Sequence, residues 1–411
     1  MSAPTVILGS GIVGLSTAYY LSRSGSTKPQ DIYLVDPIPK LFQCSSGLAG
    51  GFLAADWFAP SVASLGTLSF KLHKELADQN DGAKRWGYSQ STGISLSQDA
   101  EDAVGGSGED WLRDGTSRAQ AAGQKPALGA NGPAWLKRAE GATMEVISRD
   151  GSTGQIDPWR FCQFLLDECL KKGVQLHQPA KAISVSRDES GQLNGVRISK
   201  DGQEAELPCT RLVIAAGAWS PRVFTTLFPK TAARIPIAHL AGHSLLVKNP
   251  FYSGEAEDTS CHAVFATDTL GFSPEIFSRA GGEVFLAGLN STMIPLPELA
   301  TEAKIVPESM TQLKDCAAAM IGNVQGKDLE VMREALCFRP VTSSGRPIVA
   351  RIPDAKLGTG LKTKSGAQGG VYMAAGHGAW GIAQAPGTGL CLAELMEGRD
   401  TSANIKALTL P

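Results

Sequence analysis

The sequence lacks the cysteine and histidine spacings that mark metal sites and redox pairs. Its eight cysteines are scattered over 411 residues without a Cys-x-x-Cys pair, and its six histidines show no metal-ligand spacing. A disulfide framework, a thioredoxin-like redox pair and a zinc ribbon are therefore unsupported, and we expect no metal ion. We interpret the cysteines as reduced thiols that are mostly buried as small hydrophobic side chains.

The sequence also lacks long apolar runs and blocks of like charge. Its formal net charge is −2 without a basic block, so we expect no nucleic-acid partner. No run approaches the roughly 18–20 apolar residues that cross a bilayer, so we expect no membrane span. A strand is predicted almost at Met1, which leaves no room for a leader peptide, and we therefore expect a cytoplasmic protein.

The sequence does contain a nucleotide-binding pattern between Pro4 and Asp36, which reads PTVILGSGIVGLSTAYYLSRSGSTKPQDIYLVD. A short apolar strand at Thr5–Leu8 precedes a G-x-G-x-x-G motif, formed by Gly9 to Gly14, and an apolar helical pattern follows. In such a unit the first glycine makes the tight turn, the second admits a pyrophosphate and the third packs the helix against the strand. The N-terminus of the helix attracts the phosphates.

This pattern predicts a dinucleotide site. Asp36 follows Gly14 by 22 residues and can accept hydrogen bonds from the hydroxyls of an unphosphorylated ribose. The motif leaves the choice between FAD and NAD open. The alternative is a glycine-rich turn that binds nothing.

The length of the chain predicts two or more domains, because a single core stops growing at roughly 250–300 residues. Residues 99–133 are rich in Gly, Ala, Ser, Asp and Gln, which predicts a surface insertion. Up to residue 234 we predict a helix at Trp159–Lys172, strands at Val174–His177, Ala182–Ser186 and Val196–Ser199, and a buried strand from Arg211 into Gly217. Beyond it we predict an antiparallel sheet with strands at Ile237–Val247, His262–Ala266 and Glu283–Leu289 and one helix at Glu308–Ile321.

Several segments in chain order resemble the D-amino-acid oxidase family of FAD-dependent oxidoreductases, which contains glycine oxidase and sarcosine oxidase. They are VILGSGIVGLSTAYYL with Asp36, SSGLAGGFLAADW, GQIDPWRF, VIAAGAWSP, FRPVTSSGRP and VYMAAGHGAWGIAQAPGTG. The segment AGGFLAADW is most similar to fungal and plant members. The resemblance implies an α/β fold (α+β, two-domain) with a Rossmann-type FAD-binding domain and a mixed or antiparallel-sheet substrate domain. We expect residues 1–60, 150–234 and 335–411 in the first domain and residues 61–149 and 235–334 in the second.

The resemblance also implies which residues hold FAD. The pyrophosphate would lie on the first glycine motif, the ribose on Asp36, the adenine against the backbone of Ala182, and the flavin between the second segment and the C-terminal segment. The residues concerned are Gly9, Ser10, Gly11, Ile12, Val13, Gly14, Asp36, Pro37, Ser45, Ser46, Ala49, Gly50, Gly51, Phe52, Ala182, Gly217, Trp219, Cys337, Gly376, His377, Gly378, Ala379, Trp380, Gly381 and Ile382.

The function implied by the resemblance is oxidation of a C–N bond in a small amine or amino acid to an imine, by hydride transfer to flavin N5. Arg339 matches the residue that binds the substrate carboxylate in glycine oxidase-like members, and its guanidinium offers two parallel donors. The alternative is an Arg-Pro corner that ties down a loop. His377 would act beside it at the flavin. Cys337 stands where sarcosine-oxidase-like members carry a thioether to the flavin, and the alternative is an ordinary buried cysteine.

Departures from the family pattern leave the substrate and the electron acceptor open. Ser344 replaces an aspartate of the family, and Leu286 or a neighbour stands where sarcosine oxidases carry an oxygen-activating lysine. Trp57, Trp380 and His243 would shape an apolar pocket, or would belong to the core. Reoxidation by O₂ or by another acceptor both fit. Two other functions stay open: a flavin-binding protein in interaction or trafficking with degenerate catalysis, and an NAD-dependent dehydrogenase. We make no prediction of the oligomeric state.

Overall fold

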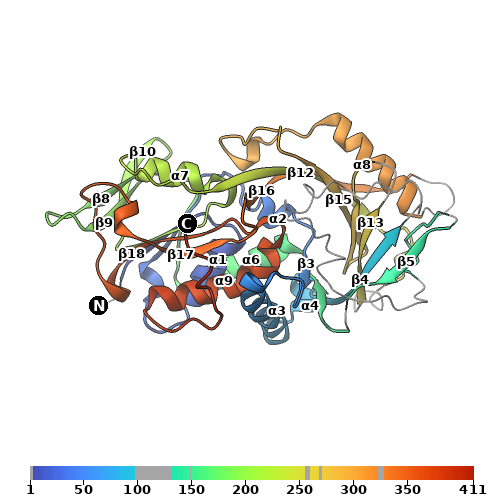
Figure 1. Cartoon of the computed structure of the whole chain (residues 1–411), viewed down its shortest axis with the longest axis horizontal. Coiled ribbons are helices and arrows are strands. Elements are labelled where there is room, and N and C mark those ends of the chain that lie inside the picture. Colours follow the sequence, from blue (N-terminus) through green and yellow to red (C-terminus); the bar gives the residue numbers. More distant parts are fainter. Residues whose placement is uncertain are drawn as a thin grey trace.

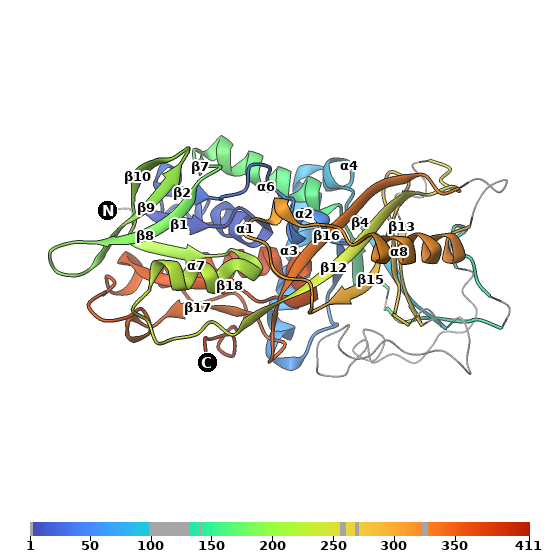
Figure 2. The same ribbon diagram turned by 90° about the horizontal axis from the view of Figure 1, so that it is seen from above.

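The computed structural model describes residues 3–97, 132–139, 141–148, 150–254, 260–267, 271–322 and 328–411. The predicted insertion at 99–133 therefore lies outside the described residues except for its last two positions. The molecule is elongated, and a parallel sheet with both chain termini occupies one half of it (Figure 1 and Figure 2). A second, larger sheet occupies the other half.

The first sheet has six strands in the order β17-β18-β11-β1-β2-β7. They are β1 (Thr5–Leu8), β2 (Ile32–Val35), β7 (Gln175–His177), β11 (Arg211–Ile214), β17 (Ile348–Ile352) and β18 (Gly370–Ala375). Neighbouring strands are parallel except at the edge, where β17 is antiparallel to β18. Every residue of β1 and β11 is buried, as expected for parallel strands covered on both faces.

Helices cover one face of this sheet, and a helix with a small sheet covers the other. The helical layer contains α1 (Ile12–Leu21), α3 (Pro60–Asn80), α4 (Gly82–Trp86), α6 (Pro158–Lys172) and α9 (Gly381–Met396). The opposite layer contains α7 (Ser220–Leu227) and the strands β8 (Lys181–Arg187), β9 (Leu193–Lys200) and β10 (Gln203–Pro208). Successive residues of β1 serve these two cores: Ile7 packs with the helices, and Val6 and Leu8 pack on the other side.

The predicted helix at 159–172 is confirmed, and its ends have clear causes. The Asp157 carboxylate accepts hydrogen bonds from the backbone N–H groups of Trp159 (2.9 Å) and Arg160 (3.2 Å) and so caps the first turn of α6. Gly173, with φ of +98°, takes the left-handed conformation that ends the helix.

The second sheet has the strand order β16-β12-β15-β14-β13-β4-β6-β3, with β5 paired beside β4. Its strands are β3 (Phe52–Ala54), β4 (Ser89–Ser97), β5 (Thr143–Val146), β6 (Thr153–Gln155), β12 (Ile237–Lys248), β13 (Ser260–Thr267), β14 (Glu275–Arg279), β15 (Glu283–Ser291) and β16 (Val331–Thr342). All pairs are antiparallel except β4 with β13, so the expected mixed or antiparallel sheet is confirmed. The helix α8 (Pro307–Met320) packs on one face.

Two features lie at the edges of the expected domain ranges. The helix α3 packs against α9 in the core beside the parallel sheet, although its residues fall in the range assigned to the substrate domain. The strand β16 pairs with β12 from Val331 to Thr342, although its second half falls in the range assigned to the FAD domain. The exact division of the chain into domains stays a prediction.

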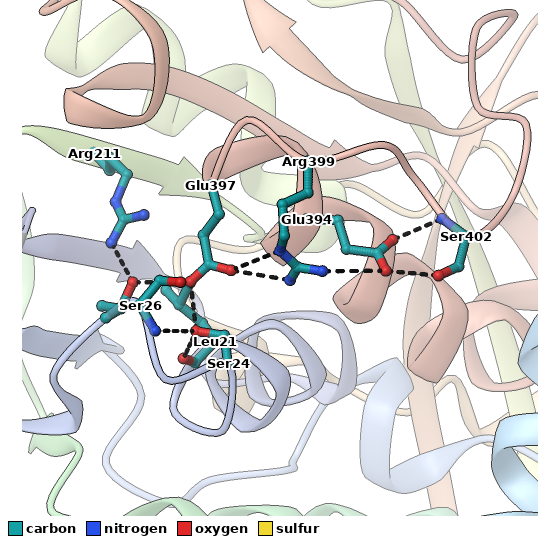
Figure 3. A network of polar contacts seen from close by, with 9 residues as sticks. Leu21, Ser24, Ser26, Arg211, Glu394, Glu397, Arg399 and Ser402 are labelled. Carbon is teal, nitrogen blue, oxygen red and sulfur yellow. Dashed lines mark hydrogen bonds and ion pairs between the residues drawn. The ribbon is translucent and has the colours of Figure 1, made fainter.

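A polar network ties the end of α9 to the first βαβ unit (Figure 3). The Arg211 guanidinium donates to Thr27 Oγ1 at 2.7 Å, and that hydroxyl donates to Glu397 Oε1 at 3.2 Å. Arg399 then joins Glu397 (2.9 Å) to Glu394 (3.6 Å). Residues close to both ends of the chain are thereby held together. Among the described helices, none has the length and apolar character that crossing a membrane requires.

Candidate functional site

A cavity of about 270 Å³ lies where the carboxyl ends of β1 and β2 meet the second sheet. This edge of a parallel sheet is where open α/β folds hold ligands. Most residues predicted to hold FAD line the cavity: Gly9, Gly11, Ile12, Val13, Asp36, Pro37, Ser45, Ser46, Ala49, Gly50, Gly51, Phe52, Ala182, Gly217, Trp219, Cys337, His377, Gly378, Ala379, Gly381 and Ile382. Four predicted residues are absent from that lining: Ser10, Gly14, Gly376 and Trp380.

The turn between β1 and α1 forms one wall. Gly9 has φ of +106°, and a Cβ there would lie 2.5 Å from the carbonyl oxygen of Ala215, so glycine is required. A Cβ on Gly11 would lie 2.7 Å from Ser46 Oγ, which accepts a hydrogen bond from the backbone N–H of Ile12 (3.0 Å). The first hydrogen bond within α1 runs from Leu15 N to Gly11 O. The N–H groups of Ile12, Val13 and Gly14 therefore have no acceptor within the helix. The Ile12 N–H donates to Ser46 Oγ instead, and Val13 lines the cavity.

Asp36 directly follows β2 beside this turn and is buried. Its carboxylate accepts hydrogen bonds from the backbone N–H groups of Ser10 (2.7 Å) and Ile38 (3.1 Å). Burial raises the pKa of Asp36, and these two hydrogen bonds oppose the rise. The Ser10 N–H thus fixes the Asp36 carboxylate, although Ser10 itself does not line the cavity.

The loop before β3 is fixed by two side chains from elsewhere in the chain. Arg279, at the end of β14, donates to the carbonyl oxygens of Ala49 (2.5 Å) and Gly50 (3.0 Å). Gln155 Nε2 donates to the same Gly50 oxygen at 2.6 Å. The Arg279 side chain is almost fully buried, and burial lowers its pKa. These contacts set the position of the backbone that lines the cavity.

Three aromatic rings form the apolar wall on the side of the second sheet. The ring centroids of Phe52 and Phe277 are 5.7 Å apart and those of Phe277 and Phe285 are 6.0 Å apart, with interplanar angles of 29° and 16°. All three residues line the cavity. A planar ligand group on this side would therefore lie against apolar surface.

Arg339 lies on β16 and lines the cavity. Its Nη1 donates to Asn290 Oδ1, which orients the guanidinium. Within the described ranges, no carboxylate lies within 4.0 Å of this guanidinium, unlike the surface arginines that form ion pairs. Its charge is therefore available to an anionic group in the cavity.

His377 lies at the start of the 3₁₀ turn η8 (Gly378–Trp380) and is buried. Its Nε2 lies 3.1 Å from Thr388 Oγ1. Burial lowers its pKa to about 4, so the imidazole is neutral near pH 7. This favours a positioning role over proton donation.

Cys337 lies two residues before Arg339 on β16 and also lines the cavity, and Cys44 lines it beside the helix α2 (Ser45–Leu48). Burial raises the pKa of Cys44 to about 11, so its thiol is protonated at neutral pH. Ser45 Oγ donates to the Phe338 carbonyl oxygen at 2.6 Å and holds α2 against β16. Cys337 thus lines the cavity as predicted. A covalent bond between Cys337 and a flavin stays a prediction.

The proposed apolar pocket of Trp57, Trp380 and His243 is only partly formed. Trp57 belongs to the core and Trp380 packs against Phe58, with ring centroids 4.8 Å apart, and neither lines the cavity. His243 lines it, and its Nε2 accepts a hydrogen bond from the Val306 N–H at 3.0 Å. Burial lowers the pKa of His243.

Leu286, at or beside the position of the oxygen-activating lysine, packs in the core under α8. Its neighbours Phe285 and Ala287 line the cavity instead. Lys181 is the one lysine among the described residues of the lining.

Sequence reasoning missed several lining residues that the second sheet supplies. Ser244 and Glu275 line the cavity on β12 and β14, and Glu275 is buried. Glu275 and Ser244 both pair with Ala287, from opposite sides. Pairing between strands that are distant in the chain brings these two residues together. The spacing of residues along the chain does not reveal such pairing.

A family model described as "DAO: FAD dependent oxidoreductase" matches residues 5–395. The chain belongs to this family. It is 28% identical over 98% of its length to a Schizosaccharomyces pombe protein provisionally named an oxidoreductase, of which 96% is covered. It is 24% identical over 96% of its length to a D-amino acid dehydrogenase of Cereibacter sphaeroides, of which 92% is covered. The fold is also similar to that of glycine oxidase from Geobacillus kaustophilus, with a TM-score of 0.70, 19% identity, and coverage of 100% of this chain and 98% of that chain.

The DAO family uses FAD, and the residues of the cavity fit this cofactor. The N-terminal end of α1 suits a pyrophosphate, and Asp36 directly follows β2, at the position where Rossmann folds carry the acid that binds ribose hydroxyls. The three phenylalanines offer the apolar surface that an isoalloxazine needs. The described part of the chain holds no cluster of three or more potential metal ligands among its His, Cys, Asp and Glu residues.

Proposed function

We propose that the protein oxidises a C–N bond of a small amine or amino acid to an imine, with FAD as the hydride acceptor. The observation that carries this proposal is Arg339, a cation that lines the same cavity as the residues expected to hold FAD and that Asn290 orients. A guanidinium suits a carboxylate because it offers two parallel donors and a charge that is never lost.

The chain's own residues would bind and orient the substrate. When bound, FAD supplies the electron sink for the hydride of the carbon next to nitrogen. Arg339 would fix the carboxylate, and the apolar residues of the lining would exclude water. His377 stays neutral near pH 7 and would hold its place through Thr388. The reactive amine would be the neutral form, because an ammonium has no lone pair.

The electron acceptor in the second half of the reaction is part of the proposal. No lysine of the described residues lies on the second-sheet side of the lining, because Lys181 lies at the start of β8. We therefore expect slow reaction with O₂ and faster turnover with an artificial acceptor. Equal rates under air and with the artificial acceptor would favour an oxidase.

A thioether from Cys337 to the flavin is tested by precipitating the protein with acid. Yellow colour in the supernatant identifies non-covalent FAD, and yellow colour in the pellet identifies a tether. The Cys337→Ser variant should release its colour in either case.

Product trapping tests the proposed reaction itself. Hydrolysis of an imine yields a carbonyl compound, which a hydrazine reagent converts into a coloured hydrazone. The purified protein is incubated with an artificial acceptor and with D- and L-amino acids, N-methyl amino acids and amines without a carboxylate. We expect hydrazone from one class of carboxylate-bearing amines. A protein that holds FAD but yields none from any amine would support the interaction or trafficking function instead, and a protein that takes up no FAD would support the NAD-dependent alternative.

A further inference from the structure

The segment between β15 and α8 lies across one end of the cavity. In Figure 2 this orange connection reaches back from α8 toward α7. Glu298, Leu299 and Ala300 of the segment line the cavity, and so do Lys181 on β8 and Arg222 in α7. The residues opposite the segment therefore come from the layer that covers the parallel sheet.

This end of the cavity lies beside the residues expected to hold the adenosine. The backbone N–H of Ala180 donates to the Asp36 carbonyl oxygen at 2.8 Å, so the start of β8 lies against the end of β2. Lys181 and Ala182 follow directly in the chain and both line the cavity.

Glu298 joins the segment to both neighbouring elements. One carboxylate oxygen lies 2.7 Å from Lys181 Nζ and the other lies 2.7 Å from Arg222 Nη1. Arg222 Nη1 also donates to the Pro297 carbonyl oxygen at 3.2 Å, and Trp219 Nε1 donates to that oxygen at 2.9 Å. The two cations lower the pKa of Glu298, which is therefore ionised at neutral pH.

We propose that residues 292–300 form a clasp that retains FAD, and that Glu298 holds the clasp shut by bridging Lys181 and Arg222. The proposal rests on FAD as the ligand and is independent of the substrate. All three side chains are about half exposed, so each ion pair is weak and is screened by salt. A contact of this strength can open to admit the cofactor and still slow its escape when closed. Glu298 is thus a positioning residue for the cofactor.

The rate of FAD release from the holoprotein tests the clasp. The parent protein carries Cys337→Ser, so that a covalent bond to the flavin cannot mask release, and Glu298→Gln is introduced into this parent. Release is followed by the fluorescence of free FAD after dilution. We expect Glu298→Gln to release FAD about fivefold faster at low salt, since breaking two exposed ion pairs has an effect of this order. At high salt the parent rate should approach that of the variant, because salt screens the ion pairs.

Glu330→Gln is the matched control, because Glu330 pairs with Lys248 on the surface and does not line the cavity. It should release FAD at the parent rate. Equal release by the parent and Glu298→Gln, or equal acceleration in Glu330→Gln, would overturn the clasp. The clasp would also be overturned if the release rate of Glu298→Gln depended on salt as steeply as the release rate of the parent. A protein that binds no FAD at all would instead contradict the family cofactor, which separates the two failures.

Discussion

Arg339 is the residue on which substrate recognition depends in the proposed function. Replacement by methionine should weaken binding of carboxylate-bearing substrates by about 2–5 kcal/mol, because the substrate carboxylate would be buried unpaired. Amines without a carboxylate should be affected little. Substrate titrations of Arg339→Met and of Arg346→Met, whose arginine is exposed and outside the lining, provide the comparison. Equal affinities in wild type and Arg339→Met would remove Arg339 from the substrate site.

Two buried histidines make the fold sensitive to acid. Burial lowers the pKa of His73 and of His377 to about 4, against about 6.5 in the unfolded chain. Between these values the unfolded state binds more protons than the folded state, so stability is full above about pH 6.5 and falls as the pH drops toward about 4. When the pH falls from about 7 to about 5, each histidine should lower the free energy of unfolding by about 2 kcal/mol.

The variant His73→Gln isolates one of these contributions. His73 Nε2 lies 2.9 Å from the Ile382 carbonyl oxygen, and its Nδ1 has no hydrogen-bond partner among the described residues, so glutamine can keep the contact with Ile382. Denaturant unfolding at the two pH values should show an acid-induced loss smaller by about 2 kcal/mol than in wild type. An unchanged loss would show that His73 is not the group that titrates.

The loop before β3 depends on Arg279, a residue distant in the chain. Arg279→Met would leave the carbonyl oxygens of Ala49 and Gly50 with fewer donors or none, at a cost of about 1–3 kcal/mol for each unsatisfied group. We expect a lower free energy of unfolding and weaker FAD binding, measured by denaturation and by FAD titration. Arg197→Met, which removes an exposed pair with Glu204, should leave both unchanged within about 1 kcal/mol. Unaltered FAD affinity in Arg279→Met would show that this loop does not position the cofactor.

Local pattern was enough to predict the elements whose signals are continuous in the chain. The unit from β1 to β2 was predicted because strand, glycine motif, helix and Asp36 follow one another, and α6 because its apolar positions share a face and a glycine ends it. The strand β16 was missed because Pro340 interrupts its pattern, and its pairing with β12 from Val331 to Thr342 places it in the sheet. The strand β14 was missed because a five-residue strand is defined by its neighbours.

The candidate site divides in the same way. The lining residues near the glycine motifs could be predicted because close approach of the backbone to a flat ligand requires glycine, which is visible in the sequence. Glu275, Ser244 and Glu298 reach the cavity through strand pairing and a long connection, and nothing adjacent to them in the chain indicates it. Trp57 and Trp380 were given as pocket residues with a core position as the alternative, and packing decides for the core in Trp57. Burial is a property of the whole fold and is not visible at one position.

At the scale of the whole molecule, the cavity forms where two sheets meet, so its shape depends on the packing of both halves. The polar network of Figure 3 stabilises the half that carries both termini. Arg211 is its most buried arginine and donates to Thr5 Oγ1 and Ala3 O, both at 2.9 Å.

Arg211→Met should lower the free energy of unfolding by about 2–4 kcal/mol, because several buried acceptors lose their donor. Arg399→Met removes a half-exposed arginine of the same network and should cost less than Arg211→Met, because Glu394 and Glu397 keep other hydrogen-bond donors. Denaturant unfolding of the two variants gives the comparison. A similar cost for both would show that burial does not set the strength of this network.

The most direct test of the central claim is an anaerobic spectrum of the purified holoprotein during addition of amines. We predict that a carboxylate-bearing amine bleaches the visible absorbance of the oxidised flavin, and that Arg339→Met needs a much higher concentration of the same amine. A flavin that dithionite bleaches and no amine bleaches would contradict the claim that this chain oxidises a C–N bond.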